Sequence, residues 1–138
     1  MPAQINAYIG FSGNCKEAMT FYQQCLGGSL SLVTVGESAM ADQMPDAKDQ
    51  IMHAMLVREG LVMLMGSDMA KEQIVSGNII NLMLNCSSDE EINTFFSKLS
   101  EGGVATQAPK LESWGDIFGH LTDKFGINWM LNYNKNAN

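Results

Sequence analysis

Apolar and polar positions along the first half of the chain predict four strands and one helix. The runs with the length and composition of strands are 5–11, 30–35, 51–58 and 61–65. Between the first two runs, apolar residues recur at helical spacing as far as Gly27-Gly28, a pair that favours a helix end. Residues 37–50 are mostly polar and are predicted as a loop. The first half therefore has the order β-α-β-β-β.

The second half repeats this order. Its helical segment ends at Gly102-Gly103, and a loop is predicted from Pro109 to Trp114. The strand-like runs are 79–86, 104–107, 116–122 and 128–133. Both helices begin with a pair typical of a capping box, Asn14 with Glu17 and Ser88 with Glu91.

Short sequence matches support an internal repeat. Ile5-Asn6 recurs as Ile80-Asn81 and Gly27-Gly28 as Gly102-Gly103, both at an offset of 75 residues. We therefore expect one domain over 1–138 with two β-α-β-β-β modules, at about 4–66 and 79–134, joined by a linker at 67–78. The fold class is α+β, with one helix on the outer face of each module. The faces without a helix are expected to close into a cup that holds a ligand.

Composition and charge narrow the classes of partner. The 138 residues are 46% hydrophobic and 17% charged, with a net charge of −7 and a pI near 4.6. This acidic balance argues against nucleic-acid binding, and no apolar run has the ~20 residues that a membrane span requires. Three cysteines at wide spacing form no disulfide framework, so a cytoplasmic location is expected. Cys15 follows the first helix cap, where a helix N-terminus lowers the pKa of a thiol, so a reactive thiol is a minor alternative.

The motifs resemble those of one superfamily. The matching stretches are 11–15 with Ala18, Phe21-Tyr22 before Leu26-Gly27, 118–126 with its DxxG turn, and 129–132. With the paired modules, they resemble the glyoxalase/bleomycin-resistance/extradiol-dioxygenase (vicinal oxygen chelate) superfamily, and within it the PhnB-like (YjdN-type) branch. The resemblance covers nearly the whole chain and implies a homodimer. Members of this branch are also described as ubiquinone-pathway methyltransferases, but no glycine-rich nucleotide-binding loop follows a predicted strand here.

The resemblance also implies where a divalent metal would bind. The positions that hold His or Glu ligands in active members fall on Asn6, Met63, Asn81 and Met130. Two neutral amides and two thioethers are poor ligands for a hard or borderline divalent ion. We therefore expect the superfamily metal site to be lost, with no metal ligands and no cofactor.

Methionine and asparagine dominate the predicted ligand site. The chain has eleven methionines, and strand alternation places several of them on shared faces with asparagines. His53 shares its strand face with Met55, while His120 is expected to face solvent beside a turn. Trp129 and Leu131 are expected to face the helix. The candidate ligand-binding residues are Asn6, Tyr8, His53, Met55, Met63, Met65, Asn81, Met83, Trp114, Asn128 and Met130.

These observations favour a metal-independent protein that binds a small apolar or aromatic molecule. The alternative is an enzyme of lyase, isomerase or transferase type that uses His53 as a base or a non-standard metal site. A third reading is an interaction protein whose cup is filled by its own side chains. The sequence does not identify the ligand.

Overall fold

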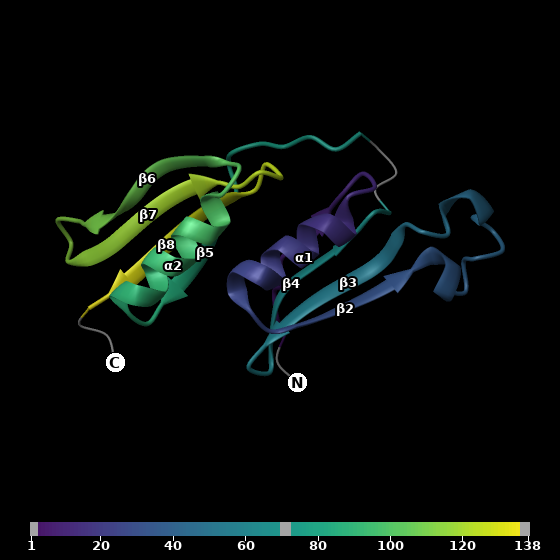
Figure 1. Ribbon diagram of the computed structural model, residues 1–138, viewed down its shortest axis with the longest axis horizontal. Coiled ribbons are helices and arrows are strands. Elements are labelled where there is room, and N and C mark those ends of the chain that lie inside the picture. The colour runs from purple at the N-terminus through teal and green to yellow at the C-terminus, as the bar shows by residue number, and fades with distance from the viewer. Residues whose placement is uncertain (1–2, 70–72, 136–138) are drawn as a thin grey trace. The chain divides into compact units, whose positions relative to one another are not determined.

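The computed structural model describes residues 3–69 and 73–135, and the chain divides into two units, Met1–Val75 and Ser76–Asn138. Each unit has one four-stranded sheet and one α-helix in the order β-α-β-β-β. The predicted α+β class and its repeated order of elements are therefore confirmed. Figure 1 shows each helix lying along the sheet of its own unit.

The first unit forms a sheet of strand order β1-β4-β3-β2. Strand β1 is parallel to β4, and the other neighbours are antiparallel. The elements are β1 (Tyr8–Gly10), α1 (Cys15–Leu26), β2 (Ser29–Thr34), the 3-10 helices η1 (Val35–Glu37) and η2 (Pro45–Ala47), β3 (Ile51–Arg58) and β4 (Leu61–Ser67).

The second unit repeats this topology with the order β5-β8-β7-β6, and β5 is parallel to β8. In both units the first strand of the module pairs with its last strand, so each four-stranded sheet is formed entirely within its own module. The elements are β5 (Leu82–Cys86), α2 (Asp89–Ser100), β6 (Val104–Leu111), β7 (Asp116–Thr122) and β8 (Asn128–Asn134).

Each helix covers one face of its sheet and leaves the other face without a helix. In the first unit α1 contacts β2, β3 and β4, and the strand residues on that face, Ala54, Leu56 and Leu64, are buried. In the second unit Trp129 and Leu131 lie buried on the face that carries α2, as predicted. Burial of apolar surface is the main stabilising term in folding, so these two faces hold each unit together. We call the opposite face of each sheet its uncovered face.

Three strands begin or end at other residues than predicted. The first strands are shorter than expected, β1 beginning at Tyr8 and β5 at Leu82. Strand β6 is longer and continues through Pro109, where a loop was expected. It is the edge strand of its sheet, and its register with β7 is irregular on both sides of Gln107. Proline is tolerated in such an edge strand because its missing N–H is not needed for pairing there.

Helix α1 begins in a way that the sequence did not indicate. Asn14 occupies the N-cap position but makes no side-chain cap hydrogen bond, so the expected Asn14–Glu17 capping box is wrong. Instead the buried carboxylate of Asp68, distant in the sequence, accepts hydrogen bonds from three backbone amides. Oδ1 accepts from the N–H of Gly13 (2.9 Å) and of Cys15 (3.0 Å), and Oδ2 accepts from that of Ile51 (2.9 Å). Helix α2 does use its predicted cap, because Ser88 Oγ accepts from the Glu91 N–H at 3.0 Å.

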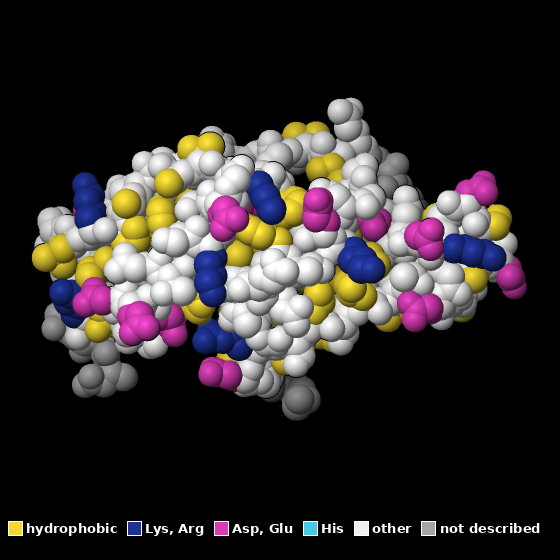
Figure 2. All heavy atoms as spheres, viewed as in Figure 1, with side chains coloured by type: hydrophobic (Ala, Val, Ile, Leu, Met, Phe, Trp, Pro, Cys, Tyr) yellow, Lys and Arg dark blue, Asp and Glu magenta, His cyan; other side chains and the backbone are white. Residues whose placement is uncertain are grey.

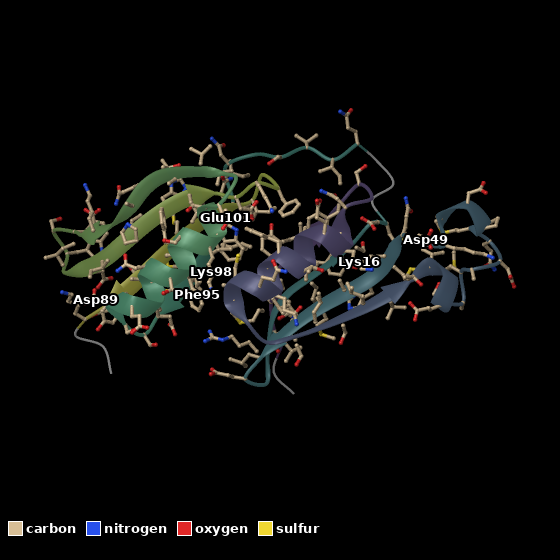
Figure 3. The ribbon with its side chains drawn as sticks, in the orientation of Figure 1. Lys16, Asp49, Asp89, Phe95, Lys98 and Glu101 are labelled. Carbon is tan, nitrogen blue, oxygen red and sulfur yellow. The ribbon has the colours of Figure 1, made fainter. Side chains whose placement is uncertain are left out.

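The same environment makes Cys15 unreactive. Its side chain is fully buried, and desolvation, together with the nearby charge of Asp68, raises the pKa of the thiol from an ordinary 9.0 to about 12. The alternative of a thiol activated by the helix N-terminus is therefore wrong, because burial outweighs the helix dipole at this position. The adjacent Lys16, labelled in Figure 3, is exposed.

Substituting Asp68 by Asn tests the role of its carboxylate. The amide NH₂ cannot accept a hydrogen bond, so at least one buried backbone N–H loses its partner. We expect the free energy of unfolding to fall by about 2 kcal/mol, measured by urea denaturation. Asp49→Asn is the matched control, since Asp49 lies exposed in the connection between β2 and β3 (Figure 3). Equal stability of the two variants would contradict this role.

The raised pKa of Cys15 predicts a loss of stability in alkaline solution. The folded state holds the thiol proton more tightly than the unfolded state, so this contribution is complete below pH 9.0 and declines as the pH rises toward 12. We expect urea denaturation to show a larger fall in stability between pH 8 and pH 10.5 for the native protein than for Cys15→Ala. Identical pH slopes for the two proteins would rule out this account.

Candidate functional site

The uncovered face of the first unit carries one row of side chains that crosses all four strands. Tyr8 is paired in register with Met65, Met65 with Met55, and Met55 with Ser31. Residues paired in register lie on the same face of a sheet, so this row has an aromatic ring at one end, two thioethers in the middle and a hydroxyl at the other end. Its methionines are half-buried, and Tyr8 is 54% exposed.

His53 lies beside this row. It is two residues before Met55 on β3, and its ring centroid lies 5.9 Å from that of Tyr8. This contact places the two rings on the same face of the sheet, as predicted from strand alternation. Figure 2, which shows the side of the first unit that carries α1, has no histidine at its surface.

A second row crosses the uncovered face of the second unit. Met83 is paired in register with Met130, Met130 with His120, and His120 with Gln107. The expectation that His120 faces solvent beside a turn is therefore wrong. His120 is half-buried, and its Nε2 lies 3.2 Å from Asn81 Oδ1. The β7–β8 hairpin pairs His120 with Met130. This pairing was the sequence signal that could have assigned His120 to the same face as Met130.

Amides surround the second row. The Asn132 side-chain NH₂ donates to Asp116 Oδ2 at 3.0 Å, and Asn132 is paired in register with Phe118. The ring of Trp114 lies edge-on to that of Phe118 at a centroid distance of 6.2 Å and is 62% exposed. The sequence did not single out Phe118, although its place on this face follows from the pairing of β7 with β8. This face therefore offers aromatic rings, thioethers and oriented polar groups together.

Two predicted ligand residues have local structural partners. Asn128 accepts from Thr122 Oγ1 at 2.8 Å and donates to the Gly77 carbonyl at 2.7 Å, which uses both ends of its amide. Asn6 precedes β1, is exposed and accepts from the Gln4 side chain at 3.0 Å. Asn128 thus anchors the segment before β5.

The donor set at the metal positions that the resemblance implies fits a divalent ion poorly. The first unit provides Asn6 and Met63, and the second provides Asn81 and Met130. None of the four carries a negative charge or an imidazole, the ligands that hard and borderline divalent ions prefer. Across residues 3–69 and 73–135, no three His, Cys, Asp or Glu side chains come together in a way that could hold a metal ion.

In the same ranges, neither helix is long and apolar enough to cross a membrane.

Comparison with known proteins supports one family. Residues 3–132 match the family model described as 3-demethylubiquinone-9 3-methyltransferase. Protein YjdN of Escherichia coli K12 is 30% identical, over 93% of each chain.

Solved structures have the same fold. A Pseudomonas aeruginosa protein, PA1353, is 37% identical with a TM-score of 0.83, over 96% of this chain and 98% of its own. A Bacillus cereus PhnB protein, described as a putative 3-demethylubiquinone-9 3-methyltransferase, is 25% identical with a TM-score of 0.75, over 95% and 99%. Structures described as glyoxalase/bleomycin resistance protein/dioxygenase, from Nocardioides and Burkholderia phytofirmans, share the fold at 16% and 14% identity, with TM-scores of 0.59 and 0.62. The chain therefore belongs to the PhnB-like (YjdN-type) family, whose model is described as 3-demethylubiquinone-9 3-methyltransferase, and it shares its fold with the glyoxalase/bleomycin resistance protein/dioxygenase structures.

Proposed function

We propose that this protein binds a small apolar or aromatic molecule on the uncovered sheet faces and does so without a divalent metal. The two register rows carry the proposal. The first places two adjacent thioethers between Tyr8 and Ser31, and the second places two adjacent thioethers at one end, beside His120 and Gln107. Thioethers are polarisable and adapt to irregular apolar shapes, while a few fixed polar groups orient a ligand. The donor set at the four superfamily metal positions supports the metal-independent part of the proposal.

The polar groups on the second face favour a ligand that combines an aromatic body with hydrogen-bonding groups. Phe118 and Trp114 offer ring edges and faces for stacking. His120 is oriented by Asn81, whose Oδ1 accepts, so this hydrogen bond has the ring Nε2–H as its donor and leaves Nδ1 able to accept from a ligand. A purely aliphatic ligand would leave these groups without partners, which is unfavourable.

The alternative enzyme, with His53 as a base, has less support. A general base is normally oriented by a second hydrogen-bonding group. Among the described residues, the contact that His53 makes is the ring contact with Tyr8.

The homodimer and the cytoplasmic location stay predictions, which light scattering of the purified protein and cell fractionation would test.

A charge on the second uncovered face tests the proposed binding. A thermal-shift screen of aromatic and amphiphilic compounds should first identify a binder, and calorimetry then gives its Kd. Met83 is 51% exposed, so Met83→Glu should fold normally, yet a buried carboxylate against an apolar ligand should weaken binding at least about ten-fold.

Thr94→Glu is the control for this experiment. It adds the same charge at an exposed position of α2, on the covered side of the same unit, and should leave the Kd unchanged. A native protein that binds no compound in the screen would contradict the proposal. Equal affinities of native protein and Met83→Glu would exclude the second face as the site.

A further inference from the structure

Three soft metal ligands, His53, Met55 and Met65, lie together on the uncovered face of the first unit. Strand β3 carries His53-Ala54-Met55, and the neighbouring β4 carries Met63-Leu64-Met65. Met55 and Met65 are paired in register, which places their Cβ atoms about 4.5–5.5 Å apart. Strand alternation puts His53 on the same face as Met55. The cluster therefore contains two thioethers and one imidazole.

An irregularity in the sheet falls at Met63. Leu64 is paired with Leu56, but Val62 is paired with the next residue, Val57, so Met63 has no residue opposite it. Met63 thus lies beside Val57, which is four residues along β3 from His53, or about 13 Å, so Met63 is too far from His53 to share an ion with it. Met55 and Met65 are half-buried, whereas Met19 on α1 is fully buried in the core. The sulfur atoms of the cluster are thus not sealed into the core of the unit.

The nature of these donors determines which ion they suit. Thioethers are neutral and soft, and soft sulfur ligands select Cu(I) over the divalent ions that prefer carboxylate or imidazole. A monovalent ion also needs no anionic ligand to balance a second charge. The neutral thioethers of Met55 and Met65 therefore suit a soft ion.

We propose that His53, Met55 and Met65 bind one Cu(I) ion through their thioether sulfurs and an imidazole nitrogen. This site does not depend on the proposed binding of an organic molecule, because it uses sulfur lone pairs and not apolar surface. The second unit gives the internal comparison. Its row also has two methionines, but its histidine is already hydrogen-bonded to Asn81, whereas His53 makes a ring contact with Tyr8.

The test measures binding of Cu(I) to the full chain under anaerobic reducing conditions, in competition with bicinchoninate. We expect one equivalent to bind. The double variant Met55→Leu/Met65→Leu keeps the apolar volume but removes two sulfurs, and it should bind at least ten-fold more weakly. The matched control Met83→Leu/Met130→Leu makes the same change on the second unit and should bind as the native protein does. No stoichiometric binding, or equal binding by the two double variants, would overturn the proposal.

A second measurement on the native protein removes the dependence on variants that fold poorly. Ag(I), a redox-inert probe, should shift the NMR resonances of the Met55 and Met65 methyl groups and leave that of buried Met19 in place. Cysteine is a competing soft ligand, and Cys15, Cys25 and Cys86 are all buried. Binding of Ag(I) that leaves the Met55 and Met65 signals unmoved would assign the ion to a thiol and overturn the proposal.

The same double variant separates the two proposals. Leucine preserves the apolar surface, so Met55→Leu/Met65→Leu should still bind the compound found in the thermal-shift screen while losing Cu(I). Loss of Cu(I) binding alone supports the ion site. Unchanged Cu(I) affinity in this variant refutes the ion site, whatever the result with the organic compound.

Discussion

A four-stranded sheet has two faces, and each unit of this protein supplies one helix. This constraint sorts the strand residues into two classes. Those facing α1 or α2, such as Leu56 and Leu131, are buried and apolar, while their neighbours in sequence face away from the helix. The chain places methionine, histidine, asparagine and tyrosine in this second class. The side chains able to bind a ligand are therefore concentrated on the face of each sheet that does not carry the helix of its unit.

Two buried carboxylates hold the connections that frame these faces. Asp68 accepts from three backbone amides at the start of α1 and of β3. In the second unit, Asp123 accepts from the N–H groups of Phe125 and Ile127 and from the indole N–H of Trp129, at 2.9 Å for the last. A carboxylate can accept several hydrogen bonds at once. Each of these residues thus fixes a turn and a core element with one side chain.

Local pattern predicted most of the fold, and contacts distant in sequence account for what it missed. The repeated glycine pairs predicted both helix ends, and the structure explains their second members. A Cβ at Gly28 would lie 2.4 Å from the Val57 carbonyl oxygen, and one at Gly103 would lie 2.3 Å from that of Thr122. The cap supplied by Asp68 has no local signature, so Asn14 was chosen in its place. His120 was misplaced because its face depends on the hairpin register and not on its immediate neighbours. The faces of His53, Met55 and Met65 followed from alternation alone.

The parallel pairing of first and last strands has a consequence for the order of assembly. Tyr8 pairs with Met65, and Leu82 with Trp129, so neither sheet gains its first strand until its last strand exists. Such long-range pairs form slowly, because the chain loses the entropy of loop closure before the stabilising contacts between the strands can form. During synthesis, β1 therefore leaves the ribosome without its partner and waits while the helix and three further strands are made. Its brevity, three residues, limits the unpaired edge that it exposes in that interval.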